Sequence, residues 1–203
     1  MSIWQDYYFD NNVSTKVVFS YFYFFKGVIR MKNSFGIALA IMAAIWAYVA
    51  LALLDQHVVV WAGFVAWAAY HTVKEKEALV PTITGTIFGG VVAIISLVII
   101  AIIAGPIGNG AIAAAIAIGI TVYVLTAVKA FGNIPANVLG FAGTAAIFKE
   151  QVLENMVLQS AMDGDVIGVV SLNLHHPLVI AALSFIGGAI FANLTVKLAA
   201  KLG

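Results

Sequence analysis

The sequence contains no cysteine, and charged residues make up only 9% of its 203 residues. The absence of cysteine excludes disulfide bonds, thiol nucleophiles, iron–sulfur ligation and thiolate zinc sites. Soluble domains carry about a quarter charged residues, whereas 63% of this chain is hydrophobic. A soluble core of this length cannot hide that much apolar surface. The composition therefore excludes a disordered protein, a nucleic-acid-binding domain and a cytosolic enzyme, and it predicts an integral membrane protein.

Long apolar runs dominate what is present. A helix needs about 20 apolar residues to cross the hydrocarbon of a bilayer, with about 17–25 as the usual range. Six stretches satisfy this: residues 36–54, 57–73, 78–104, 111–128, 131–148 and 177–196. Their continuous apolar runs exclude the alternating strands of a membrane β-barrel. The sequence predicts an all-α membrane protein with about six transmembrane helices in one polytopic domain, residues 31–203.

Positive charge is distributed unevenly between the two sides of this arrangement. If the N-terminus is cytoplasmic, every Lys and Arg except Lys149 lies in a segment on the cytoplasmic side. The positive-inside rule therefore favours six crossings with both termini in the cytoplasm.

Two segments do not fit six plain crossings. Residues 149–165 place apolar side chains at helical spacing opposite acids and Gln, which predicts a short helix on the outer membrane interface. Residues 1–30 hold ten of the aromatic residues, and Met31 looks like a second start. These thirty residues are either an upstream extension or an aromatic interfacial anchor.

A short internal similarity links two of the apolar stretches. Residues 63–69, GFVAWAA, and residues 140–146, GFAGTAA, are identical at four of seven positions. The stretches that follow them, 78–104 and 177–196, each begin near a proline and carry a Gly-Gly pair. The similarity is either a coincidence among common membrane residues or the trace of two inverted three-helix repeats, an arrangement common in transporters.

The spans contain no Asp, Glu, Lys or Arg. This favours a neutral solute, a passive pore or a protein without a transport role over a proton relay. The most unusual span, 131–148, carries Asn133 and Asn137 around Pro135. Either Pro135 breaks the helix and frees backbone groups for a solute, or the helix starts after Pro135 and Asn137 bonds a neighbouring helix.

The candidate residues of a solute path are polar or aromatic side chains in these spans. They are Asn133, Pro135, Asn137, Thr144, Thr82, Thr86, Trp61 and His71. Each also has a structural interpretation: the threonines bond their own helix, Trp61 belongs to an aromatic belt, and His71 is interfacial. Adjacent His175 and His176 near two acids give only a weak metal signal.

The sequence lacks the common motifs of catalytic and phosphate-binding sites. It has no Ser/His/Asp set, phosphate loop or HExxH motif. We therefore expect no catalytic residue, no metal, no cofactor and no enzymatic activity.

Two segments carry a resemblance to a known family. VVVWAGFVAWAAYH, residues 58–71, and FGNIPANVLGFAGTAAIF, residues 131–148, resemble a family of small bacterial inner-membrane proteins, the domain-of-unknown-function family 1097. The resemblance covers roughly residues 31–196. It implies a multi-pass protein of the inner membrane with no assigned activity, and it supplies no catalytic residues.

Together these patterns predict a channel or secondary transporter for a small solute. Its expected partners are the lipid bilayer, a small-molecule solute and further copies of the chain in a homo-oligomer, but no nucleic acid. The alternative is a non-transporting assembly or regulatory protein that acts through its outer acidic segment.

Overall fold

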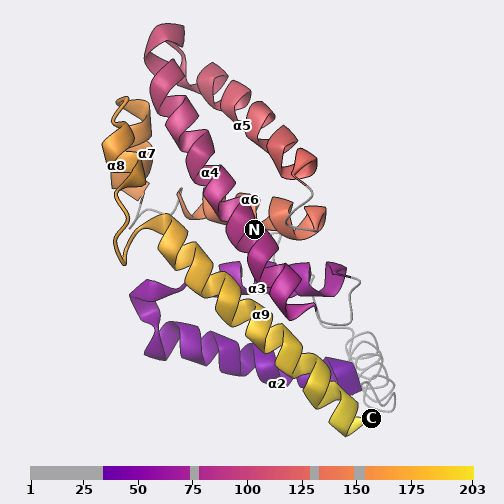
Figure 1. The fold of residues 1–203 in the computed structure, drawn as a ribbon. Helices are drawn as coiled ribbons and strands as arrows, with labels where there is room; N and C mark the ends of the chain where they lie inside the picture. Colours follow the sequence, from indigo (N-terminus) through magenta and orange to yellow (C-terminus); the bar gives the residue numbers. More distant parts are fainter. Residues whose placement is uncertain (1–33, 74–77, 129–132, 149–153) are drawn as a thin grey trace, which may run out of the picture.

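The computed structural model describes residues 34–73, 78–128, 133–148 and 154–203, and within these ranges every regular element is a helix (Figure 1). The elements are α2 (Ser34–Tyr48), η1 (Val49–Leu53), η2 (Asp55–His57), α3 (Val60–Thr72), α4 (Leu79–Ile107), α5 (Gly110–Ala127), α6 (Ile134–Ile147), α7 (Glu154–Met162), α8 (Val166–Val170) and α9 (Pro177–Leu202). The all-α prediction is confirmed. The predicted N-terminal extension, residues 1–30, lies outside the described residues.

A helix occupies each of the six predicted stretches, but the helices differ in length. Four have the length and apolar composition to cross a membrane: α2 with η1, α4, α5 and α9. At about 1.5 Å per residue, the 29 residues of α4 span about 44 Å. The 13 residues of α3 and the 14 of α6 span only about 20 Å, against about 30 Å of hydrocarbon. The six-crossing count therefore stays a prediction.

The turn between α4 and α5 shows how the sequence ends one span and starts the next. Gly108 takes the left-handed conformation, with φ 67°, and its N–H donates to the carbonyl of Ala104 at 2.9 Å. Asn109 then caps α5, because its Oδ1 accepts from the N–H of Ala111 at 3.0 Å. A glycine tolerates the positive φ and an asparagine suits the N-cap, so this tight turn follows directly from the sequence.

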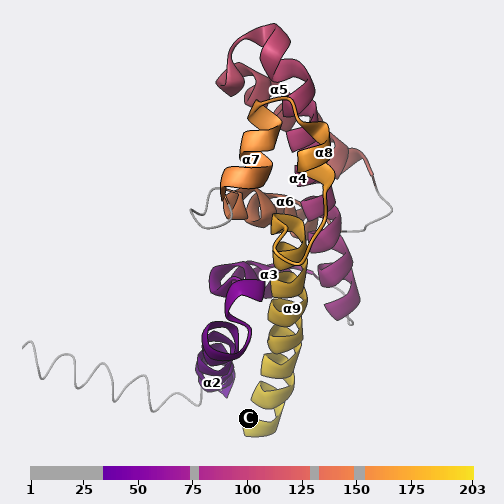
Figure 2. The same cartoon turned by 90° about the vertical axis from the view of Figure 1, so that its left-hand side faces the viewer.

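The six helices in the predicted spans pack in two groups. α2 and α3 pack against α9, whereas α5 and α6 pack against α4. α4 and α9 contact each other, and so do α3 and α6, which join the two groups at the centre (Figures 1 and 2). α7 and α8 lie side by side against α4, on the flank seen in Figure 2.

Glycines lie at the points where the short helices cross the long ones, and they allow the two backbones to come close together. A Cβ atom at Gly140 of α6 would collide with the backbone of Thr86 in α4. A Cβ atom at Gly188 of α9 would likewise collide with the backbone of Gly63 in α3. Small residues let helix backbones approach closely in membranes. Gly63 and Gly140 are the matching glycines of the internal similarity, and each lies at such a crossing.

Candidate functional site

Four of the eight predicted residues lie buried on α4 and α6, the two helices that cross at Gly89 and Gly140. Thr82 and Thr86 come from α4, and Asn137 and Thr144 come from α6. All four side chains are buried, and Asn137 is only 1% exposed. Asn137 and Thr144 are seven residues apart, which places them on one face of their helix. We call these four residues the α4–α6 seam.

The two seam threonines of α4 are satisfied within their own helix. The Thr82 hydroxyl donates to the carbonyl of Ala78 at 2.6 Å, and the Thr86 hydroxyl donates to the carbonyl of Thr82 at 2.8 Å. Both hydrogen bonds agree with the structural interpretation of these threonines, in which each hydroxyl bonds its own helix.

The two seam residues of α6 are not fully satisfied. The Asn137 amide donates from Nδ2 to the carbonyl of Leu125 at 3.4 Å, but its Oδ1 has no hydrogen-bond partner. The Thr144 Oγ1 has none either. Both oxygens face glycines of α4, since a Cβ atom at Gly85 or Gly90 would lie 2.9 or 2.8 Å from them. A buried polar group without a partner costs about 1–3 kcal/mol, so the seam offers hydrogen-bonding capacity that the protein itself does not use.

Asn133 and Pro135 lie at the start of α6. The helix begins at Ile134, and Asn133 Oδ1 accepts from the N–H of Ala136 at 3.2 Å as its N-cap. Pro135 is in the first turn, where a helix needs no backbone donor. Pro135 therefore starts a helix and does not interrupt one, and Asn137 bonds the neighbouring helix α5.

Trp61 and His71 both belong to α3 and not to the α4–α6 seam. Trp61 is partly buried against a core cluster that includes Ile147 and Ile180. His71 is exposed at the end of the helix, with its ring centroid 5.5 Å from those of Phe35 and Tyr70.

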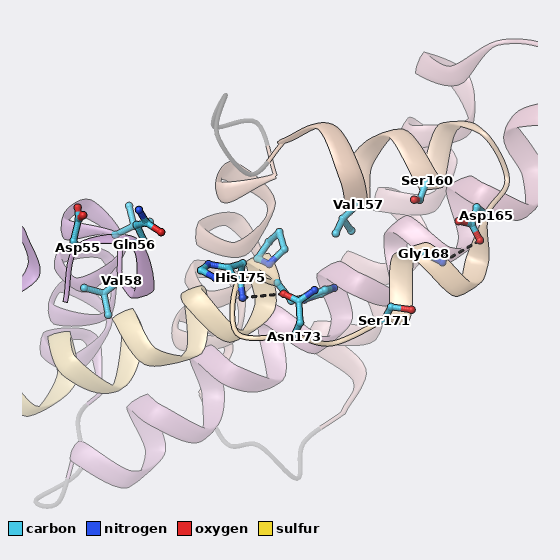
Figure 3. A pocket seen from close by; sticks show the side chains of 13 residues that line it. Asp55, Gln56, Val58, Val157, Ser160, Asp165, Gly168, Ser171, Asn173 and His175 are labelled. Atoms are coloured by element: carbon cyan, nitrogen blue, oxygen red, sulfur yellow. Dashed lines mark hydrogen bonds between the residues drawn. The ribbon is translucent and has the colours of Figure 1, made fainter.

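A cavity of about 730 Å³ lies between η2, α7, α8 and the start of α9 (Figure 3). We call it the outer cavity, because most of the residues around it belong to segments predicted to lie outside. Its polar lining consists of Asp55, Gln56, Ser160, Asp165, Ser171, Asn173, His175 and His176. None of the eight predicted path residues lines it.

His176 joins two walls of the outer cavity. The N–H of Leu178 donates to Nδ1 at 3.1 Å, so the ring proton is on Nε2, which donates to the carbonyl of Val169 at 3.1 Å. The ring is only 2% exposed. Desolvation by this burial lowers the pKa of His176, and the bond to Val169 partly opposes that shift. A neutral imidazole thus connects α8 to the first turn of α9.

The outer cavity is not predicted by the sequence, in which the adjacent histidines give only a weak metal signal. The His175 ring lies 5.8 Å from that of His57, and in the part of the chain that the structure describes no three His, Cys, Asp or Glu side chains are placed to hold a metal. The usable signal was the run of polar residues on both sides of the short apolar segment 166–170.

These helices are those of a multi-pass membrane protein, with buried polar groups and small residues at the helix crossings. The model of the DUF1097 family, proteins of unknown function, matches residues 36–200, and the chain belongs to this family. The resemblance inferred from the sequence is therefore confirmed. No curated protein and no solved structure shows significant similarity to the chain.

Proposed function

We propose that the protein is a gated channel or secondary transporter for a small neutral solute in a bacterial inner membrane, with no enzymatic activity. The observation that supports this most is the pair of partnerless oxygens, Asn137 Oδ1 and Thr144 Oγ1, on one buried face of α6. In lipid, such oxygens find partners only in protein, water or a bound solute.

The charge pattern of the helices supports a neutral solute. Residues 79–107, 110–127 and 134–147 contain no Asp, Glu, Lys or Arg. A charged solute moving between these helices would find no counter-charge, whereas a neutral solute needs only hydrogen bonds.

The packing of the seam supports gating over a permanently open pore. Gly89 and Gly140 hold the backbones of α4 and α6 too close for a methyl group. A solute therefore passes along the seam only when α6 separates from α4. α4 and α6 belong to different three-helix repeats as predicted from the sequence, and movement of one repeat against the other is how repeat-built transporters alternate access.

We also propose that α2–α3–α4 and α5–α6–α9 are inverted repeats. Equivalent helices make equivalent contacts: α3 packs on α9 as α6 packs on α4. The alignment that pairs Gly63 with Gly140 also pairs Trp67 with Thr144. Both Trp67 Nε1 and Thr144 Oγ1 are buried without a hydrogen-bond partner.

The predicted topology has six crossings and both termini inside. The contacts between segments support it, because segments predicted on the same side of the membrane lie together. Asp55 and His175, from two segments predicted to lie outside, line one cavity. The third such segment lies close to α7, since a Cβ atom at Gly110 would meet the end of Met162. Ser34 and Gly203, both predicted inside, also lie together. A homo-oligomer in the bilayer completes the proposal.

The test is solute flux into proteoliposomes. We expect vesicles that contain the protein to equilibrate at least one small neutral solute, such as urea, formamide or glycerol, faster than empty vesicles in stopped-flow light scattering. Acetate, as a small anion, should show no acceleration. A protein that accelerates no solute would contradict transport and favour the non-transporting role through the outer acidic segment.

A further inference from the structure

We infer that Ser96 of α4 is a further solute-binding residue, which extends the path of the α4–α6 seam toward the outer end of α4. This inference rests on the proposed transport of a small neutral solute. It follows from a buried hydroxyl without a hydrogen-bond partner and from the position of that hydroxyl on α4.

The buried hydroxyl groups in the described part of the chain are of two kinds. Most donate to the carbonyl four residues earlier in their own helix, at distances of 2.6–2.8 Å. Ser96 Oγ and Thr144 Oγ1 do not, and neither has any hydrogen-bond partner among the described residues. The usual way to bury a hydroxyl inside a helix is therefore not used at these two positions. The hydroxyls bonded to their own helix are those of Thr82, Thr86, Thr121, Ser184 and Thr195.

The Ser96 hydroxyl is a cost to the folded protein. The side chain is only 3% exposed, and a buried polar group without a partner lowers stability. Alanine at the same helix position would bury no polar group. A hydroxyl that bonds a passing solute accounts for this cost, whereas a purely structural role does not.

Ser96 lies on the face of α4 that meets α6. It is seven residues after Gly89 and eleven after Gly85, which are about two and three helical turns, so the three residues share one face. At both glycines this face contacts Asn137. At about 1.5 Å per residue, Ser96 is about 10 Å beyond Gly89, toward the end of α4 that is predicted to lie outside. α4 continues past α6 in this direction to its turn into α5 (Figure 1). A solute that leaves the seam along this face therefore reaches Ser96.

The three unpartnered groups define the chemistry of the solute. Asn137 offers only an acceptor, because its Nδ2 already donates to the carbonyl of Leu125. The hydroxyls of Thr144 and Ser96 can each donate and accept. Residues 79–107 supply no charge. These groups suit a small neutral solute with at least one N–H or O–H donor and one acceptor, such as an amide or a urea.

The first experiment measures solute flux per folded molecule in proteoliposomes, with the neutral solute that the wild type transports. Ser96→Ala should lower the flux about tenfold through the loss of one hydrogen bond. Its melting temperature should stay equal or rise, because the variant no longer buries an unpartnered hydroxyl. Thr121→Val is the matched control, since the buried Thr121 hydroxyl donates to the carbonyl of Ala117 at 2.8 Å, and it should retain the flux of the wild type. Unchanged flux in Ser96→Ala beside a lowered flux in Asn137→Ala would refute the role of Ser96 and leave transport through the seam intact.

The second experiment does not depend on transport. The chain has no native cysteine, so Ser96→Cys introduces a single thiol, and iodoacetamide, a small neutral amide, is the probe. Alkylation needs the thiolate, which apolar burial suppresses, so Ser96→Cys should react about tenfold or more faster than Thr121→Cys. Intact-mass measurements on the full chain in proteoliposomes follow the reaction. Equal rates in the two variants would overturn the inference. A reactive Ser96→Cys in a protein whose wild type carries no solute would refute transport and retain Ser96 in a site that admits small amides.

Discussion

At the scale of single residues, glycines decide how closely the helices pack. Gly140 has no room for a Cβ atom because the backbone of Thr86 fills that space, whereas Gly119 on α5 has nothing within 4 Å of the corresponding position. The same substitution should therefore have opposite effects at the two sites.

We expect Gly140→Ala to lower stability by about 1–3 kcal/mol, the usual cost of forcing a methyl group into a packed interior. Gly119→Ala should be neutral or slightly stabilising, because alanine is favoured over glycine in a helix by about 0.8–1 kcal/mol. Thermal unfolding of the purified protein in detergent measures both. Equal melting temperatures for the two variants would show that the crossing is not as tight as the contacts indicate.

His176 should make stability depend on pH. Its pKa is lowered from 6.5 in the folded protein by desolvation. An unfolded chain therefore takes up a proton below about pH 6.5 that the folded chain resists, and the contribution of His176 is present above this pH and is lost as the pH falls. Protonation at Nδ1 also removes the bond from Leu178 that starts α9.

The measurement is the melting temperature between about pH 5 and 8, the range in which histidine titrates. The wild type should lose stability on acidification, and His176→Asn should lose less. His175→Asn, with an exposed neighbouring ring, should behave like the wild type. The same acid sensitivity in His176→Asn would assign the effect to another group.

How far the sequence predicts single residues depends on whether their contacts are local. The N-cap roles of Asn109 and Asn133 follow from position and residue type. The contact of Asn137 with Leu125 does not, because it depends on how α6 lies against α5. The outer cavity escaped prediction for the same reason: its walls come from segments more than a hundred residues apart.

At the scale of elements, hydropathy overestimates the length of two helices. In the described residues of the stretches 57–73 and 131–148, helices cover only Val60–Thr72 and Ile134–Ile147. Val58, Val59 and Val73 are apolar enough to extend the first stretch but adopt an extended backbone. Hydropathy reports which residues avoid water, and it does not report which of them are helical.

The crossings by α3 and α6 can be tested with single cysteines, because the chain has no native cysteine to react. With a membrane-impermeant maleimide on intact spheroplasts, Gln56→Cys and Gln159→Cys should react. Lys74→Cys and Lys129→Cys should react only after permeabilisation. The reason is that the first pair flanks the outer ends, and the second pair the inner ends, of the predicted crossings.

If Gln56→Cys and Gln159→Cys are labelled, labelling at Lys74→Cys in intact spheroplasts would place both ends of α3 outside, and labelling at Lys129→Cys would do the same for α6. Because α4 and α5 lie between Lys74 and Lys129 and are long enough to cross, these two positions should lie on the same side of the membrane. Either result would therefore leave a protein with four crossings, the number of helices that are long enough on their own.

At the scale of the whole molecule, composition and two motifs were enough for the class and the family. The packing partners of each helix were not predictable. In a soluble helix an apolar stripe marks the buried face, but helices in lipid are apolar on all sides. Ile112, Ile116 and Ile120 are exposed on α5 although they are as apolar as the core residues of α4. The internal similarity between residues 63–69 and 140–146 includes two glycines, Gly63 and Gly140, that both lie at helix crossings, and the repeats it suggests stay a prediction.

The most direct test of the central proposal compares two asparagines that bond between helices. Asn137 lies in the α4–α6 seam, whereas Asn193 accepts from the Tyr70 hydroxyl at 3.2 Å outside it. An interhelical polar contact in a membrane averages only about 0.6 kcal/mol, so both Asn137→Ala and Asn193→Ala should fold.

The measurement is solute flux per folded molecule in proteoliposomes, with the neutral solute that the wild type transports. Asn137→Ala should lower the flux about tenfold or more, because a solute loses a hydrogen bond worth roughly 1–3 kcal/mol, while Asn193→Ala should retain the flux of the wild type. If Asn137→Ala lowers the melting temperature sharply and leaves flux per folded molecule unchanged, Asn137 only holds helices together and the seam is not the solute path.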